Sequence, residues 1–283
     1  MSWGAVRSAI GVAAATLGLA GADAASAQGR LDARYTVTLA GIPIGKGAWV
    51  IDIAESQYTA AASGATAGLL RVFASGQGSG ASRGLIVGGT PVPASFAASI
   101  TSDKRTEEIR MTLGSGDVKD FEITPAPSPD TERVPVTEMH TRGVSDPMTA
   151  SLFRVPGQGN PLGPQACQRV SSIFDGRIRY DLQFVYKRME QVKADKGYHG
   201  PVVVCAVYFV PVAGYIPSRA AVKYLTNQRD MEVWLAPVAA TRVLVPFRVS
   251  IPTPIGVGVM QATQFVSAAQ PPRAAAANPA RTQ

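Results

Sequence analysis

Apolar and polar residues alternate with a period of two along most of this chain, and turn residues interrupt the alternation at short intervals. Between residues 177 and 192 the alternation places four large side chains on one face, namely Tyr180, Leu182, Phe184 and Tyr186. An alternating segment suits a β-strand, which buries one face and leaves the other to solvent. The pattern therefore predicts a mainly β fold.

The predicted strands are numerous and the predicted helices few. Strands are expected at residues 34–39, 47–53, 57–65, 95–101, 107–113, 118–123, 177–192, 202–210, 229–235, 241–251 and 258–266. Residues 41–45 (G-I-P-I-G) are expected to form a turn, and short helices are expected at 67–73 and at 148–155. The second helix should start at Ser145-Asp146-Pro147, which supplies a capping side chain, an acid and a proline in the first turn. A sheet of about a dozen strands tends to curl or close. We therefore expect one large curved antiparallel sheet or an open half barrel, with two or three short helices.

The first 27 residues have the three parts of an export signal. Arg7 is basic, residues 9–22 are small or aliphatic, and Ala25-Ser26-Ala27 is a cleavage site that leaves Gln28 as the new N-terminus. The alternative, a membrane anchor, is disfavoured because the apolar stretch is shorter than the roughly 20 residues that span a bilayer. We expect a cleaved signal peptide (1–27), a single β-rich domain (28–266) that does not span the membrane, and a disordered Ala/Pro tail (267–283).

The chain has two cysteines, Cys167 and Cys205. Behind an export signal they are expected to form a disulfide, because the compartments outside the cytoplasm are oxidising. The alternative is a pair of buried free thiols. A bridge between them would stabilise the fold by about 4 kcal/mol in the chain-entropy account.

The formal net charge of +7 is spread along the chain. The densest basic stretch, from Lys187 to Lys196, is interrupted by Glu190 and Asp195. Nucleic acid is not expected as a partner of an exported protein. A well-solvated surface is the simplest interpretation of this charge, and weak attraction to anionic lipid or polysaccharide is the alternative.

Known enzyme motifs do not fit the sequence. Residues 41–47 differ from a phosphate-binding loop in glycine spacing and have Gly47 where Ser or Thr is required. His140 and His199 are not at metal-ligand spacing from another His or Cys. We therefore predict a protein without catalytic residues, metal or cofactor.

Residues 174–181 combine charged and aromatic side chains more densely than any other segment. Asp175-Gly176 predicts a hairpin turn. Arg177, Arg179 and Tyr180 are candidate ligand-binding residues, since two guanidinium groups at a polar rim could orient an anionic ligand. The alternative is a tight turn whose charges pair across strands.

Several of these segments together resemble one protein family. They are residues 35–45, Cys167, residues 174–182, Gly200-Pro201 with Cys205, and residues 211–215 (P-V-A-G-Y). In these segments the chain resembles the domain of unknown function 3108 family, in particular its cysteine-containing members, over residues 34–266. The resemblance implies a periplasmic, β-rich protein with no established catalytic residues. Its expected architecture is similar to the curved sheets of periplasmic lipoprotein carriers, by analogy of fold.

Three hypotheses for function follow. In the first, the protein binds a lipid or another apolar envelope ligand in the concavity of the curved sheet. In the second, it is a structural or interaction module that binds another envelope protein and no small ligand. The third, a hydrolase, would require a constellation of side chains that the sequence does not reveal.

Overall fold

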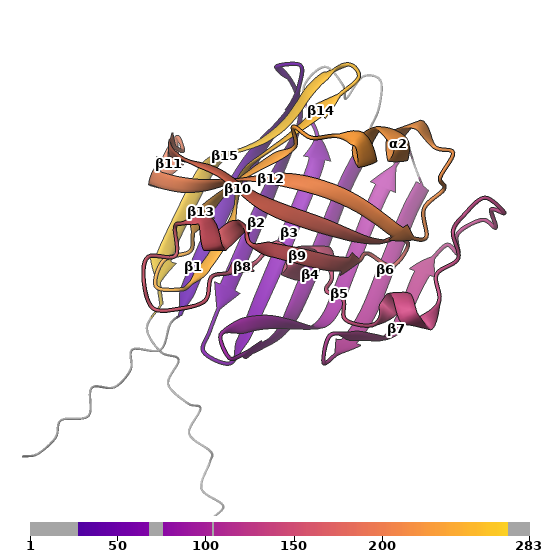
Figure 1. Cartoon of the computed structure of the whole chain (residues 1–283), viewed down its shortest axis with the longest axis horizontal. Coiled ribbons are helices and arrows are strands. Elements are labelled where there is room, and N and C mark those ends of the chain that lie inside the picture. Colours follow the sequence, from indigo (N-terminus) through magenta and orange to yellow (C-terminus); the bar gives the residue numbers. More distant parts are fainter. Residues whose placement is uncertain (1–27, 68–75, 104, 271–283) are drawn as a thin grey trace, which may run out of the picture.

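The first half of the chain folds into successive hairpins, in which each strand pairs antiparallel with the next (Figure 1). The computed structural model describes residues 28–67, 76–103 and 105–270. The strands of this half are β1 (Gly29–Leu39), β2 (Ile42–Ile53), β3 (Gln57–Thr66), β4 (Gly76–Val87), β5 (Thr90–Ser102), β6 (Arg105–Gly114) and β7 (Asp117–Thr124).

The second half continues the same sheet. Its long strands are β9 (Arg169–Phe174), β10 (Arg179–Lys193), β12 (His199–Ala213), β13 (Glu232–Pro237), β14 (Val243–Thr253) and β15 (Gly256–Ala269). Two short strands, β8 (Phe153–Arg154) and β11 (Lys196–Gly197), pair with β14 and β15. The last strand, β15, pairs with β1 along its length, so the two halves form one sheet that runs from β7 through β1 and β15 to β9. No strand pairing joins β7 to β9 within the described ranges, which confirms the predicted open antiparallel sheet.

Within residues 28–67, 76–103 and 105–270, helices are few and short. They are the α-helices α1 (Pro147–Ala150) and α2 (Ala220–Asn227) and the 3-10 helices η2 (Glu138–Thr141) and η3 (Pro164–Cys167). Among the residues that the structure describes, no helix is long and apolar enough to cross a membrane.

The sheet bends so that its second half crosses over its first half. In Figure 1, β9, β10 and β12 run in front of β3 to β6. The largest core cluster joins β1–β3 to β12–β15, and its bulkiest fully buried members are Tyr58, Phe247, Phe265, Leu31 and Ile51. A second cluster links Phe174 of β9 to apolar residues of β5 and β6. The protein's own side chains therefore pack the space between the two halves.

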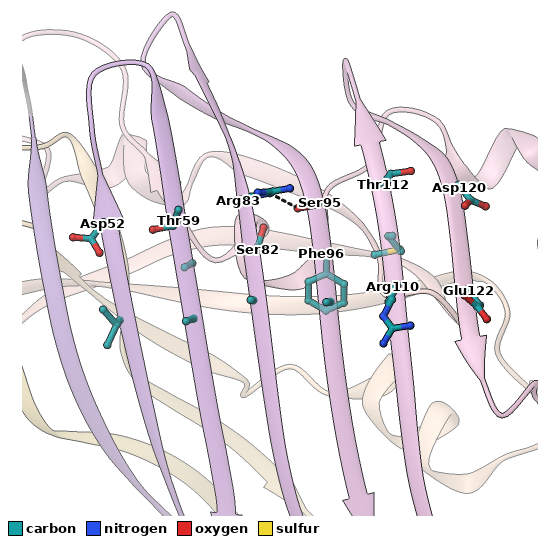
Figure 2. A pocket seen from close by; sticks show the side chains of 16 residues that line it. Asp52, Thr59, Ser82, Arg83, Ser95, Phe96, Arg110, Thr112, Asp120 and Glu122 are labelled. Carbon is teal, nitrogen blue, oxygen red and sulfur yellow. Dashed lines mark hydrogen bonds between the residues drawn. The ribbon is translucent and has the colours of Figure 1, made fainter. Parts of the chain in front are cut away.

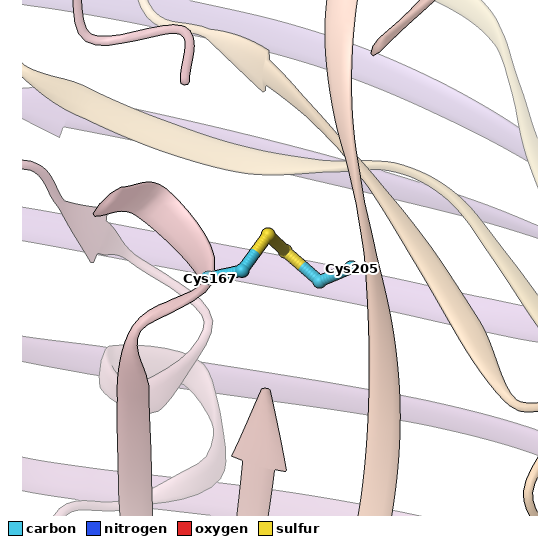
Figure 3. The surroundings of a disulfide bond; sticks show 2 residues. All are labelled: Cys167 and Cys205. Carbon is cyan, nitrogen blue, oxygen red and sulfur yellow. A yellow bond between two sulfur atoms is a disulfide. The ribbon is translucent and has the colours of Figure 1, made fainter. Parts of the chain in front are cut away.

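The predicted disulfide is present. Cys167 at the end of η3 and Cys205 in the middle of β12 form a bridge with a Cα–Cα distance of 5.6 Å (Figure 3). Both residues are completely buried in a core cluster that also contains Phe153, Phe184 and Leu235. The bridge thus fixes the segment before β9 to the face of β12 that it covers.

A buried carboxylate attaches α1 to the first half of the sheet. Asp146 has no exposed surface, and its Oδ1 accepts hydrogen bonds from Met148 N (2.9 Å) and Thr149 N (3.0 Å). Its Oδ2 accepts from Ser82 Oγ of β4 (3.0 Å) and Thr149 Oγ1 (2.5 Å). Because the Thr149 hydroxyl donates to Asp146, the Tyr58 hydroxyl of β3 donates to Thr149 Oγ1 at 2.5 Å. Burial raises the pKa of the Asp146 carboxyl, while these hydrogen bonds act in the opposite direction.

The turn expected at residues 41–45 lies earlier in the chain. Ala40 and Gly41, with φ of 48° and 82°, connect the strands, and β2 already begins at Ile42. Two successive residues with positive φ match the twist of an antiparallel hairpin. Pro43 is tolerated in β2 because it lies opposite Thr38, where the register between β1 and β2 shifts. The prediction treated this proline as part of the turn and was wrong on that point.

The helix expected at residues 148–155 is much shorter. Pro147 begins it as predicted, but the capping side chain is Asp146 and not Ser145, and the helix ends at Ala150. Phe153 and Arg154 instead form β8 and pair with Leu244 and Val243 of β14. Phe153 is buried in the cluster around the disulfide. Its packing there explains why the chain forms β8 at this point and does not continue as a helix.

Other boundaries also differ from the sequence-based expectation. The helix α2 was not predicted, and β15 continues to Ala269, into the segment expected to be a tail. The expected helix at 67–73 lies almost entirely outside the described residues, as do the signal segment and residues 271–283.

Candidate functional site

A row of small side chains crosses the outer face of the first half of the sheet. The strand registers place Ala61 of β3 opposite Ala81 of β4, and Ala81 opposite Ala97 of β5. All three alanines are exposed, and half-buried Val50 of β2 continues the row. The solvent-facing side of an antiparallel sheet normally carries polar side chains. Here the short side chains leave a depression that is lined by residues of six neighbouring strands, β2 to β7.

This depression, which we call the outer hollow, has a volume of about 650 Å³. Figure 2 shows the polar side chains around it: Asp52 and Thr59 lie towards one side, and Asp120 and Glu122 towards the other. Between them, Arg83 Nε donates to Ser95 Oγ across β4 and β5 (3.0 Å; Figure 2). The hollow therefore combines an apolar floor with a polar rim of both charge signs.

A second depression, which we call the arginine cleft, lies where four separate segments meet. It has a volume of about 740 Å³. The cleft is lined by the β5–β6 hairpin, the proline-rich segment that follows β7, the β9–β10 turn and the residue that precedes α2. These segments contribute four arginines, Arg105, Arg133, Arg177 and Arg219, and three acidic residues, Asp103, Glu107 and Asp130.

The turn that carries Arg177 is set by its own sequence. Asp175 Oδ1 accepts hydrogen bonds from the backbone N–H groups of Arg177 (2.8 Å) and Ile178 (2.7 Å). Gly176 has a φ of 98°, and a Cβ there would lie 2.7 Å from Ile109 Cγ2 of β6. The hairpin indicated by Asp175-Gly176 is present, but residues 175–178 form a four-residue connection and not the two-residue turn expected from that pair. The turn holds Arg177 against β6.

The three candidate ligand-binding residues do not share one site. Arg177 lines the arginine cleft and forms an ion pair with Glu107. Arg179 instead pairs with Asp181 at 2.7 Å, and the Tyr180 ring packs against Phe209 with centroids 5.5 Å apart. Neighbouring residues on a strand point to opposite faces, so Arg179 and Tyr180 cannot both face the ligand that Arg177 would meet. Of the three residues, Arg177 is the one that lines the arginine cleft.

Two of the basic residues in this stretch of the sequence, Lys187 and Arg188, pair with acids of β10 and β13. Lys187 Nζ and Arg188 Nη1 both contact Glu232 Oε1, at 2.6 and 2.9 Å. Hydrogen bonding from Arg188 is the main cause that lowers the pKa of Glu232 to about 2. Glu190 accepts a further bond from Arg188. The charges of Lys187 and Arg188 are therefore paired, while Lys193 and Lys196 are exposed to solvent.

The two histidines lie apart from both depressions. His140 Nδ1 accepts a hydrogen bond from Thr137 N (3.1 Å) at the start of η2, and His199 is an exposed residue at the start of β12. In the part of the chain that the structure describes, no group of three or more His, Cys, Asp or Glu could hold a metal ion.

Comparison with known proteins agrees with the resemblance noted in the sequence. No curated protein matches the chain. Among solved structures, the crystal structure of a β-barrel-like protein of domain of unknown function DUF1849 from Brucella abortus matches 84% of this chain and 97% of its own, with 8% identity and a TM-score of 0.42. A family model described as protein of unknown function (DUF3108) matches residues 34–263. Because that match spans most of the chain, the protein belongs to the DUF3108 family.

Proposed function

We propose that this protein is exported to the periplasm, is not an enzyme, and binds an apolar envelope ligand, such as a lipid acyl chain, in the outer hollow. The observation that carries the proposal is the exposed row Ala61–Ala81–Ala97 with Val50 beside it. Small-molecule sites are typically mostly apolar depressions of roughly 300–1,000 Å³ with a few polar groups at the edge. The outer hollow, at about 650 Å³, has this size and composition.

The site differs from the one first expected from the sequence. An apolar ligand was expected in the concavity of the sheet, but core side chains such as Tyr58, Phe247 and Phe265 pack between the two halves. The outer hollow is open without any rearrangement of that core. A ligand there would cover apolar surface that water now contacts, which favours binding.

An interaction module for another envelope protein is the second candidate. The feature that favours it is the open sheet, whose order ends at β7 and β9. An edge strand can pair with a strand of a partner. However, β7 carries Asp117, Lys119, Asp120 and Glu122, and charged side chains on an edge oppose such pairing. We therefore rank it below the ligand-binding function.

Filling the outer hollow is expected to abolish retention of the ligand. In Ala81→Trp or Ala97→Trp an indole would occupy the apolar floor. Ala268→Trp is the matched control, because Ala268 is an exposed strand alanine of β15 that does not line the hollow. Protein purified gently from periplasm is analysed by native mass spectrometry and organic extraction. The wild type and Ala268→Trp should carry the same lipid mass, and the two hollow variants should lack it.

Two results would contradict this proposal. A wild-type protein that stays without ligand when envelope lipids are offered would shift the assignment to the interaction module. Retention of an equal amount of lipid by Ala81→Trp and Ala97→Trp would place the ligand elsewhere. Circular dichroism of each variant serves to separate a blocked site from a fold that has been lost.

The proposed export of the protein to the periplasm predicts a specific N-terminus. Protein recovered from the periplasmic fraction should begin at Gln28, because Ala25-Ser26-Ala27 is a signal-peptidase site. Intact-mass measurement and N-terminal sequencing of that fraction test this. Recovery of the chain in the cytoplasm with residues 1–27 attached would contradict the periplasmic assignment.

A further inference from the structure

The arginine cleft is distinct from the outer hollow and has a different chemistry. The two depressions share no lining residue. The cleft arginines come from four segments that are far apart in the sequence, so the fold alone brings the guanidinium groups together. Its acidic residues are fewer, three against four arginines, so the cleft has a small positive excess.

Much of the donor capacity of these arginines is unused within the protein. Arg177 pairs with Glu107, yet its buried Nε has no hydrogen-bond partner. Arg133 Nη1 donates to the backbone carbonyl of Gly214 (2.5 Å) and has no carboxylate partner in the described chain. Arg105 and Arg219 are exposed and, within the same described ranges, form no ion pair. A guanidinium group has five N–H donors, and buried polar atoms are normally hydrogen-bonded.

The surroundings of the arginines suit a small ligand. Pro125, Pro127 and Pro129 form one wall, and the fixed φ of proline limits how far that wall can move. Ile100, of which 51% is exposed, also lines the cleft and gives it one apolar contact. Four arginines line the cleft, and a phosphate group offers more oxygen acceptors to several guanidinium groups than a carboxylate, which has two.

We propose that the arginine cleft binds a phosphate group, with Arg105, Arg133 and Arg219 as its donors. The phosphate could belong to a water-soluble phosphate ester or to the headgroup of a phospholipid, because both present the same oxygens. This site is independent of the outer hollow, and either assignment can fail without the other.

The test uses the mature full-length protein and three probes: inorganic phosphate, glycerol 3-phosphate, and vesicles of phosphatidylglycerol compared with phosphatidylcholine. Calorimetry or ³¹P NMR measures the soluble probes, and co-sedimentation measures the vesicles. The variants are Arg105→Gln, Arg219→Gln and the double variant, which change exposed side chains only. Arg142→Gln is the control, since it removes the same charge at an exposed arginine outside the cleft.

We expect saturable binding that weakens about tenfold for each arginine removed and is unchanged in Arg142→Gln. Loss of glycerol 3-phosphate binding in the double variant supports the site with a soluble ester as ligand. Loss confined to phosphatidylglycerol vesicles supports it with a lipid headgroup as ligand. Equal binding by the wild type and the double variant, or absence of binding to every probe, would overturn the proposal. Acetate bound as tightly as phosphate at equal ionic strength would overturn the assignment to phosphate.

Discussion

Replacement of Cys205 by serine is expected to lower the free energy of unfolding by about 4 kcal/mol, and Cys167→Ser should lower it by a similar amount. The bridge joins residues 38 apart, and opening that loop returns conformational freedom to the unfolded chain. Both sulfur atoms belong to residues with no exposed surface, in a cluster with Phe184 and Leu235. Serine in that cluster would add the cost of burying a hydroxyl group.

Urea denaturation without reductant measures this loss, and the double variant is the critical control. Because either substitution alone already opens the loop, the double variant should be little less stable than each single one. Stability losses that simply add would indicate that the two side chains act independently. Cys167→Ala with Cys205→Ala separates loss of the bridge from the burial of the hydroxyl groups.

Asp146→Ala is expected to destabilise the protein by roughly 3–5 kcal/mol. The substitution removes the acceptor for four donors, two backbone N–H groups of α1 and the hydroxyls of Ser82 and Thr149. Ser82 and Thr149 are themselves buried, so water cannot replace the lost partner without entering the core. Chemical denaturation of Asp146→Ala beside the wild type measures the effect. Ser172→Ala, which removes a half-buried hydroxyl bonded to Asp181, is a suitable control and should cost much less.

The Asp146 carboxyl should also make the free energy of unfolding depend on pH, in a direction that follows from its raised pKa. Burial raises the pKa of Asp146 in the folded protein above its ordinary value of 3.8. The folded state therefore binds a proton more readily than the unfolded state does, and this contribution to stability increases as pH falls through the folded-state pKa towards 3.8. The free energy of unfolding of the wild type should rise relative to that of Asp146→Asn in that window. A difference between the two proteins that stays constant or shrinks on acidification would contradict the raised pKa.

Local sequence signals were sufficient to predict a structural element wherever the contacts that determine it lie close together in the sequence. The β9–β10 turn was predictable because Asp175 satisfies backbone groups only two and three residues away, and because Gly176 is needed for a positive φ. The start of α1 was predictable for the same reason, since Asp146 caps it. The disulfide was predictable because only two cysteines were available. The end of α1, by contrast, depends on where Phe153 packs, and its packing partners lie far away in the sequence.

The two depressions could not be predicted, because both depend on alignment between distant segments. Whether Ala61, Ala81 and Ala97 fall in one row depends on the register of three strands, and the register between β4 and β5 shifts beside Arg83. An error of one residue would move each side chain to the opposite face. Similarly, Arg105, Arg133 and Arg219 carry no motif, and only the crossing of the second half over the first brings them to Arg177.

The pairing of β1 with β15 bears on the order in which the chain can fold. From β1 to β7 every strand pairs with its neighbour in sequence, so these hairpins can form while the rest of the chain is still emerging. The other edge of β1 must wait for β15, more than 200 residues later, because Gly29 pairs with Ala269 and Leu39 with Gly258. Until then this edge is a free template for strands of other molecules. Closure of this edge therefore needs nearly the whole chain, and until β15 pairs with it the edge of β1 is exposed to misassembly.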